Sequence, residues 1–314
     1  MVALVTALPG LSEVPIVGIF GGCPPEHAAS IAARATPLPR LALGPVWWMS
    51  YAGFQGRKRM DDSSVIDTLY AARKEGRAAS IPSDGLDLQK ALELQLAVAD
   101  RFIAEGDEIG GWKIGLTSSS SRDLMGEGVR PFGYVLGSRI LSPDDEIPWK
   151  TVFRCAIEPE LCLIMGSALH GKVDSTEAKS AVRSVAAAFE INELRVGGHE
   201  ADRTALVADG LVNWGIVVGA EVPVKQFDGI SGVAVELTRD GEIVARAKAG
   251  DDLEIDDPFL SLSRLATLLG EHGRGLEAGQ PVITGKFAGP LPVEGPGSWT
   301  ATFSRIGDVS VRFS

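Results

Sequence analysis

Two glutamates in a short apolar run could hold a metal ion between them. Glu158 and Glu160 lie in the run Cys155–Ile164 and are separated by one proline. Side chains of a strand alternate between its two faces, so both carboxylates would point the same way. Two like charges on a buried face repel each other unless one acid is protonated or a cation lies between them, and carboxylate oxygens are the ligands that Mg²⁺, Mn²⁺ or Ca²⁺ prefer. An edge strand whose glutamates face water is the alternative, and the run alone leaves both interpretations open.

A third acid and a lysine lie in two other predicted strands. Glu190 and Asn192 would share one face of a strand over Phe189–Glu193, which offers a further carboxylate. Lys113 lies inside a predicted strand over Ile109–Leu116, where a buried amine needs a carboxylate or a water-filled cavity. The lysine could instead lie on an edge strand and extend to solvent.

Several other catalytic sites are excluded by composition or spacing. The four histidines are scattered, which disfavours a zinc site built from histidine, and no Gly-x-Ser-x-Gly motif of a serine hydrolase is present. The stretch from Gly279 to Lys286 resembles a phosphate-binding loop, but it has one residue too many between its glycines, and Phe287 replaces the Ser or Thr that would hold Mg²⁺. Three acids and one lysine remain, and these groups are suited to metal-assisted enolate chemistry.

Helices and strands in a mixed order must position these residues. Asp61 and Asp87 are candidate N-caps of two helices that would end at Gly76 and Gly106. Asp174 could cap a helix that runs to Ala188, directly before the strand that carries Glu190. The remaining pattern predicts strands over 213–219, 282–287, 299–303 and 309–313, a hairpin over 233–247 that turns at Asp240-Gly241, and a helix that begins at Pro258. The second half of the chain is therefore expected to be mostly β.

The charge of the chain limits its partners. The 314 residues carry a formal net charge of −11 and have a sequence pI near 4.9, which disfavours a nucleic-acid or anionic-membrane partner. No stretch of about eighteen apolar residues runs without proline or charge, so the sequence predicts no membrane-spanning helix. Three cysteines without a paired spacing fit a reducing compartment, and we expect a cytoplasmic protein.

The first 59 residues differ in composition from the rest. They contain seven prolines, two acidic residues and five basic residues, and the prolines interrupt every apolar run. A transit peptide would be acid-poor and Arg-bearing in the same way, but it would be richer in serine. We predict that residues 1–59 are a disordered leader or that translation starts at Met60. Peptides from 1–59 in the natively expressed protein would contradict the second interpretation.

Five motifs, found in order between residue 61 and the C-terminus, resemble one enzyme family. They are Gly111-Trp112-Lys113-Ile114-Gly115-Leu116-Thr117-Ser118, Ile157-Glu158-Pro159-Glu160-Leu161, Phe189-Glu190-Ile191, Val207-Ala208-Asp209 and Gly307-Asp308-Val309-Ser310-Val311-Arg312-Phe313. Together they resemble the 2-keto-4-pentenoate hydratase and 4-oxalocrotonate decarboxylase branch of the fumarylacetoacetate hydrolase superfamily.

The resemblance implies a fold, a cofactor and a reaction. The fold would be α+β, a mixed β-roll of the fumarylacetoacetase C-terminal type with peripheral helices, in one catalytic domain over 60–314, helical over 60–130 and mostly β over 131–314. The chain would form a homo-oligomer or pair with a homologous lyase subunit. Its substrate would be a 2-oxo or 2-hydroxydienoic acid from aromatic-compound degradation, which a hydratase would hydrate. The implied site residues are Glu158, Glu160 and Glu190 as ligands of Mg²⁺ or Mn²⁺, Lys113 as the catalytic residue that moves a proton, and Leu161, Asp209 and Lys286 as substrate contacts.

Three departures from the family pattern affect the reaction. Hydratases of this kind usually have an aspartate where this chain has Pro131, and decarboxylases tend to have an apolar residue there. Lys286 replaces a small or hydroxyl residue, and it could either bind a second substrate carboxylate or lie on the surface. Gly210 replaces an asparagine that follows Asp209, and Asn213 is the available substitute. A decarboxylase and a catalytically silent partner subunit therefore remain as alternatives to the hydratase.

Overall fold

The computed structural model of the chain describes residues 60–82, 85–118, 121–143, 145–196, 203–250 and 253–314. The predicted leader, residues 1–59, lies outside the described residues. The described residues belong to one compact unit. Within the described residues, no helix is long and apolar enough to cross a membrane.

A mixed sheet of eight strands carries the predicted site residues. Its hydrogen-bonded order is β2-β1-β10-β5-β6-β7-β3, with β11 paired to β5. The β1–β10 and β3–β7 pairs are parallel, and the other pairs are antiparallel. The strands are β1 (Ile109–Ile114), β2 (Phe132–Leu136), β3 (Ile140–Leu141), β5 (Cys155–Met165), β6 (Val182–Glu193), β7 (Asn213–Pro223), β10 (Pro281–Lys286) and β11 (Leu291–Pro292).

A second sheet of five strands packs against β6 and β7. Its order is β4-β13-β12-β8-β9, and its β12 and β13 strands contact the large sheet. The predicted hairpin is confirmed: β8 and β9 pair around Asp240 and Gly241, which both have left-handed φ. The strands are β4 (Glu146–Ile147), β8 (Ala234–Arg239), β9 (Glu242–Lys248), β12 (Gly297–Phe303) and β13 (Gly307–Phe313).

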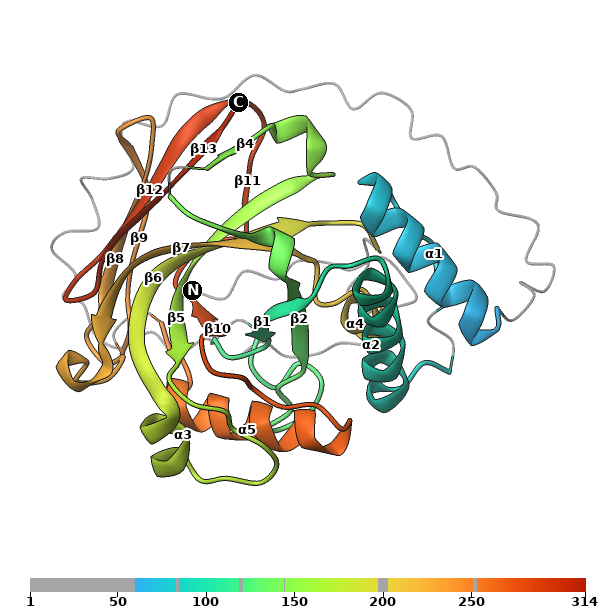
Figure 1. The fold of residues 1–314 in the computed structure, drawn as a ribbon. Helices are drawn as coiled ribbons and strands as arrows, with labels where there is room; N and C mark the ends of the chain where they lie inside the picture. Colours follow the sequence, from blue (N-terminus) through green and yellow to red (C-terminus); the bar gives the residue numbers. More distant parts are fainter. Residues whose placement is uncertain (1–59, 83–84, 119–120, 144, 197–202, 251–252) are drawn as a thin grey trace, which may run out of the picture. The chain divides into compact units, whose positions relative to one another are not determined.

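The helices lie at the periphery of the sheets (Figure 1). Helices α1 (Asp62–Glu75) and α2 (Leu88–Ala104) pack on each other, and α2 also contacts α4 (Arg203–Ala208). Helices α3 (Ser175–Ala181) and α5 (Pro258–Glu271) pack together at another end. Single 3₁₀ turns are η1 (Gly137–Arg139), η2 (Trp149–Thr151) and η3 (Val224–Gln226). The predicted α+β class, with a mixed sheet and helices outside it, is confirmed.

One predicted helix was too long. The sequence predicted a helix from Thr176 to Ala188, but α3 ends at Ala181 and residues from Val182 onward belong to β6. The alanines of this stretch favour a helix in isolation. Pairing with β5 on one side and β7 on the other overrides that preference. The longer strand places Glu190 in the middle of the large sheet.

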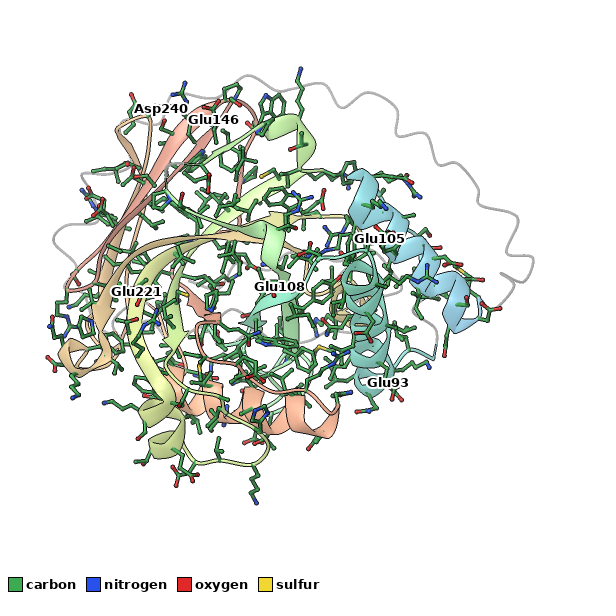
Figure 2. All side chains as sticks on the ribbon, in the orientation of Figure 1. Glu93, Glu105, Glu108, Glu146, Glu221 and Asp240 are labelled. Carbon is green, nitrogen blue, oxygen red and sulfur yellow. The ribbon has the colours of Figure 1, made fainter. Side chains whose placement is uncertain are left out.

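The acidic residues of the surface are spread over many elements. Figure 2 labels six exposed examples, which come from α2, the loop after α2, β4, β7 and the β8–β9 turn: Glu93, Glu105, Glu108, Glu146, Glu221 and Asp240. Carboxylates that face water need no cation, because solvent screens them. The buried carboxylates of the large sheet are in a different situation.

Candidate metal centre

Strand β5 is buried along its whole length and presents two acids on one face. Glu158 and Glu160 alternate with apolar residues of the opposite face and are 6% and 3% exposed. On the face that carries the acids, Cys162 and Ile164 continue into a small apolar cluster with residues of β2, β6, β7 and β10. The inner face of the sheet thus has an apolar part and an acidic part.

Strand β6 adds the third acid. Glu190 is the direct cross-strand partner of Glu158, and opposed residues of an antiparallel pair project to the same face. Ligand oxygens of Glu158, Glu160 and Glu190 all lie within 4.8 Å of one another. The two sequence segments that supplied the acids therefore converge as predicted.

Lys113 of β1 points into this group. Its Nζ donates hydrogen bonds to Oε2 of Glu190 at 2.6 Å and to the carbonyl oxygen of Leu211 at 3.1 Å. The Lys113 side chain is 10% exposed. The edge-strand alternative for this lysine is excluded, because β1 lies between β2 and β10.

A second lysine contacts the acids from β10. Lys286 donates a hydrogen bond from Nζ to Oε1 of Glu158 at 2.9 Å. Of the two positions predicted for this lysine, the pocket and the protein surface, the structure supports the pocket. Asn192 donates to the other oxygen of Glu158 at 3.2 Å, and Asn213 donates to Oε1 of Glu190 at 2.9 Å.

Protonation of the acids follows from burial and from these partners. Burial and the charge of Glu190 hold the pKa of Glu160 well above its ordinary value. Burial also raises the pKa of Glu190, to about 7, although Lys113 opposes the shift. Glu158 behaves differently: burial would raise its pKa, but the ammonium groups of Lys286 and Lys113 outweigh that effect and lower it.

The pKa of Lys113 is raised, although the lysine is buried. Burial does disfavour the ammonium form, but Glu190, Glu158 and Glu160 together outweigh it. The lysine is therefore an ammonium when only the three acids surround it.

The three acids fit a divalent cation. Oε2 of Glu160 is buried and has no hydrogen-bond partner among the described residues, whereas both oxygens of Glu158 and of Glu190 have donors. An unpartnered buried carboxylate oxygen is costly, and a cation would satisfy it. Three carboxylates form an oxygen-only ligand set, which suits Mg²⁺ or Mn²⁺.

The acids open onto a pocket of about 230 Å³. Its polar wall includes Lys113, Lys286, Glu158, Glu160 and Asn192, together with the hydroxyl residues Thr117, Ser118 and Ser121. Its apolar wall consists of Ile114, Leu116, Leu194, Leu206, Leu211, Val212 and Pro290. A flat unsaturated acid could place its charged end on the polar side and its carbon chain against the leucines.

Three residues that line this pocket have a left-handed backbone without being glycine. Leu116, Leu211 and Val212 have φ of 58°, 56° and 58°. Such conformations cost about 1–3 kcal/mol each and persist where the surroundings enforce them. Leu211 and Val212 belong to one turn, over residues 210–212, and the Leu211 carbonyl of this strained turn accepts the hydrogen bond from Lys113.

Two of the predicted substrate contacts, Leu161 and Asp209, do not line this pocket. The Leu161 side chain is fully buried in the main hydrophobic core, on the face of β5 opposite to the acids, because neighbouring strand residues alternate. Asp209 is paired with Nε of Arg195, 3.0 Å from its Oδ1, and it does not line the pocket. Neither side chain is in a position to contact a substrate there.

Arg195 is a buried residue beside the site that the sequence did not predict. It is 2% exposed and pairs with Glu193 as well as with Asp209. This network ties the end of β6 to the turn that supplies Leu211 and Asn213. A lone arginine just after a predicted strand gave no signal of this role.

Pro131 occupies the position where hydratases of the resembling family have an aspartate. It is buried, and its carbonyl accepts a hydrogen bond from the backbone N–H of Gly115 at 2.8 Å. Within the described part of the chain, the carboxylates that line the pocket are Glu158 and Glu160. A dedicated water-activating acid is thus not found at this place.

Comparison with known proteins identifies relatives of both kinds. No family model matches the chain. A 2-keto-4-pentenoate hydratase from Paraburkholderia phymatum is 25% identical over 263 residues, covering 81% of this chain and 100% of the relative. A 4-oxalocrotonate decarboxylase from a Pseudomonas species is 28% identical over 228 residues, covering 72% and 88%.

Solved structures share the fold. The 4-oxalocrotonate decarboxylase from Pseudomonas putida G7, complexed with magnesium and adipate, has a TM-score of 0.74 at 22% identity and covers 83% of this chain and 100% of its own. A fumarylacetoacetate hydrolase family protein from Yersinia pestis CO92 has a TM-score of 0.50 at 16% identity, covering 65% and 92%. The predicted β-roll is thereby confirmed. The chain is a homologue of the 2-keto-4-pentenoate hydratases and 4-oxalocrotonate decarboxylases and has the fold of the fumarylacetoacetate hydrolase family.

Proposed function

We propose that this protein is a divalent-metal-dependent lyase that hydrates a 2-hydroxy-2,4-dienoate to a 4-hydroxy-2-oxo acid. The observation that carries the proposal is the group of three buried acids within 4.8 Å of one another, with the Lys113 ammonium 2.6 Å from one of them. The hydratase relatives, matched over their full length, support the same reaction.

Glu158, Glu160 and Glu190 would hold Mg²⁺ or Mn²⁺. The magnesium in the complex of the decarboxylase neighbour supports this choice. When bound, such an ion polarises the 2-oxo group and stabilises enolate charge as a Lewis acid.

Lys113 would move the proton that the reaction requires. The 2-hydroxyl of the dienol loses a proton and the distal carbon gains one, which leaves a ketone conjugated to an alkene to which water can add. Lys113 is positioned for this transfer because Glu190 and the Leu211 carbonyl fix its Nζ at the polar end of the pocket. A positioned proton-transfer group contributes about 10²–10⁴-fold to a rate.

The remaining pocket residues would bind and orient the substrate. Thr117, Ser118 and Asn192 offer donors and acceptors at the polar end. Leu206 and Leu211 would cover the carbon chain and keep excess water from the dienol.

Decarboxylation is the second candidate reaction. Pro131, in place of an acid that could activate water, favours it, and the decarboxylase relatives are as similar in sequence as the hydratases. Loss of CO₂ would leave the electron pair of the broken C–C bond on a dienolate, and ketonisation passes through a dienolate formed when the 2-hydroxyl loses its proton, so most of the site would serve either reaction.

Ultraviolet absorbance of 2-hydroxypenta-2,4-dienoate tests the main proposal. We expect decay in the presence of Mg²⁺, formation of 4-hydroxy-2-oxopentanoate, and no decay after removal of metal with EDTA. Metal-dependent CO₂ release from 4-oxalocrotonate, without hydration of either substrate, would assign the decarboxylase. Absence of both reactions with metal bound would indicate a silent partner subunit.

We also propose that the protein is a cytoplasmic homo-oligomer. The edge strand β9 exposes Ile243 and Val244, which are 49% and 42% exposed. An exposed apolar edge strand is a liability for a monomer and can be covered by another copy of the chain. Size-exclusion chromatography with light scattering measures the mass of the protein in solution. A mass equal to that of one chain would contradict the homo-oligomer.

A further inference from the structure

Lys286 contacts one of the three acids, Glu158, and also lines the open pocket. Its Nζ binds Oε1 of Glu158 at 2.9 Å, while its side chain remains 23% exposed and lines the pocket. The Glu158 side chain is 7% exposed. One end of this ion pair is therefore buried and the other remains accessible.

The backbone of β10 directs Lys286 toward the acids. Lys286 opposes Glu160 across the β10–β5 pair, and the register shifts between Ile283 and Lys286. Opposed residues project to the same face, so Lys286 points to the side that carries Glu158 and Glu160. Gly285 makes the shift possible: its φ is 92°, and a Cβ there would lie 2.6 Å from Cγ2 of Ile255.

The two lysines neutralise two of the three acids in the absence of an ion. Lys113 is bound to Glu190, and Lys286 is bound to Glu158. A divalent cation at the three acids would be repelled by the Lys286 ammonium and would compete with it for Glu158. The lysine has a flexible stem of four carbons, so it can leave the carboxylate by rotation alone.

We propose that Lys286 is an internal counter-ion of Glu158 that a bound divalent ion displaces, and that the released ammonium binds a second carboxylate of the substrate. The second half rests on the proposed function. The substrate class is then a 2-oxo or 2-hydroxydienoic acid that carries another carboxylate at the far end of its chain.

The composition of the pocket restricts which group can bind that carboxylate. Lys113 and Lys286 are the cationic residues among the described residues that line it. Lys113 keeps the Leu211 carbonyl as a partner even when an ion occupies Glu190. Lys286 loses its partner when an ion occupies Glu158, and a charged carboxylate against the leucine wall would otherwise be unpaired.

Titration calorimetry with Mn²⁺ alone tests the first half. Lys286→Met should bind Mn²⁺ about tenfold more tightly than the unaltered protein, a change that corresponds to the loss of one competing ion pair. Lys286→Arg keeps the charge and should resemble the unaltered protein. Lys172→Met, an exposed lysine outside the pocket, makes the same change in net charge and should leave the affinity within about twofold. Equal Mn²⁺ affinity in Lys286→Met and Lys172→Met would overturn the displacement of Lys286, provided that thermal unfolding shows both variants folded.

Two unreactive 2-oxo acids of equal length test the second half. 2-Oxoadipate and 2-oxohexanoate differ in the terminal carboxylate. The Mn²⁺-loaded protein should prefer 2-oxoadipate by about tenfold, and Lys286→Met should lose this preference while retaining affinity for 2-oxohexanoate. Lys286→Arg should keep the preference. Equal binding of the two acids by the unaltered protein would overturn the dicarboxylate assignment.

The two proposals fail in different ways. If the loaded protein binds neither oxo acid, the proposed lyase function is contradicted together with the substrate half of this inference, while the Mn²⁺ comparison still decides the counter-ion half. If both acids bind and the dienoate is consumed without a preference for the second carboxylate, the lyase function stands and the role of Lys286 in selectivity is refuted.

Discussion

The Nζ atom of Lys113 lies 2.6 Å from Oε2 of Glu190, although 77 positions separate the two residues and two strands lie between theirs. In a flat sheet, three strand spacings would place their backbones about 14 Å apart. The contact therefore requires the sheet to curl, and Figure 1 shows β6 strongly bent. The curl is what converts acids and an amine from distant strands into one site.

Removal of the Lys113 amine should separate chemistry from metal binding. Lys113→Met is expected to lower turnover of the dienoate by about 10²–10⁴-fold, the usual contribution of a positioned proton-transfer group. Mn²⁺ affinity should not fall, because the three carboxylates remain and lose a competing cation. Stopped-flow absorbance and titration calorimetry measure the two effects. Turnover near that of the unaltered protein would exclude Lys113 as the group that moves the proton.

Glu160→Gln should weaken metal binding without unfolding the protein. Mutation of a residue that only supports a metal ligand costs about 10–100-fold in affinity, so loss of a charged ligand is expected to lower Mn²⁺ affinity by at least that factor. In the metal-free protein, the amide resembles the protonated acid that burial and Glu190 favour at this position. Titration calorimetry would contradict the ligand assignment if the affinity were unchanged.

The same variant makes a prediction about pH. Because the folded-state pKa of Glu160 is raised, its stabilising contribution is present below the unfolded-state pKa and is lost as pH rises through the folded-state pKa. Glutamine does not titrate. The melting temperature of the metal-free variant relative to the unaltered metal-free protein should therefore increase from pH 5 to pH 8, and a difference that decreases with pH would contradict the assignment.

Those parts of the site that lie on a single strand could be predicted from the sequence. Alternation along β5 placed Glu158 and Glu160 on one face, and the same rule placed Glu190 and Asn192 together on β6. The substrate-binding role of Leu161 was transferred from a motif, whereas alternation along β5 places that side chain in the core, on the face opposite the acids.

The remainder depends on contacts that no local pattern encodes. The link between Lys286 and Glu158 needs the register shift at Gly285, and the Arg195 network needs the turn after α4 to pack against the end of β6. The start of β6 was missed for the same reason, since pairing on both sides decided it. Tertiary pairing overrides local preference in buried strands.

Arg195 is expected to be a positioning residue with a large effect on stability. Arg195→Met would leave Glu193 and Asp209 buried without their cation, which costs about 3–5 kcal/mol of unfolding free energy. Urea unfolding measures this loss. Asp209→Asn combined with Arg195→Met should recover part of it, because one of the two orphaned charges is removed. A double variant no more stable than Arg195→Met would show that the Asp209 charge is not what destabilises the single variant.

The strained turn after α4 should be stabilised by a residue that tolerates its backbone. Val212 has a φ of 58°, follows Leu211 with 56° and Gly210 with 74°, and is β-branched, which makes the left-handed region costly. The turn persists because Val212 O accepts from the N–H of Glu193 at 2.8 Å and the N–H of Leu211 donates to Leu206 O at 2.8 Å.

Asparagine adopts the left-handed region more readily than valine, so Val212→Asn should raise the unfolding free energy by about 1 kcal/mol. Thr302→Asn, at an exposed β-branched site in the inner strand β12, is the matched control and should be neutral or destabilising. If urea unfolding shows the same loss for both variants, the Val212 backbone is not strained. If the Val212→Asn variant is more stable than the unaltered protein but turns over the dienoate more slowly, the strained backbone at Val212 is needed to hold the Leu211 carbonyl against Lys113.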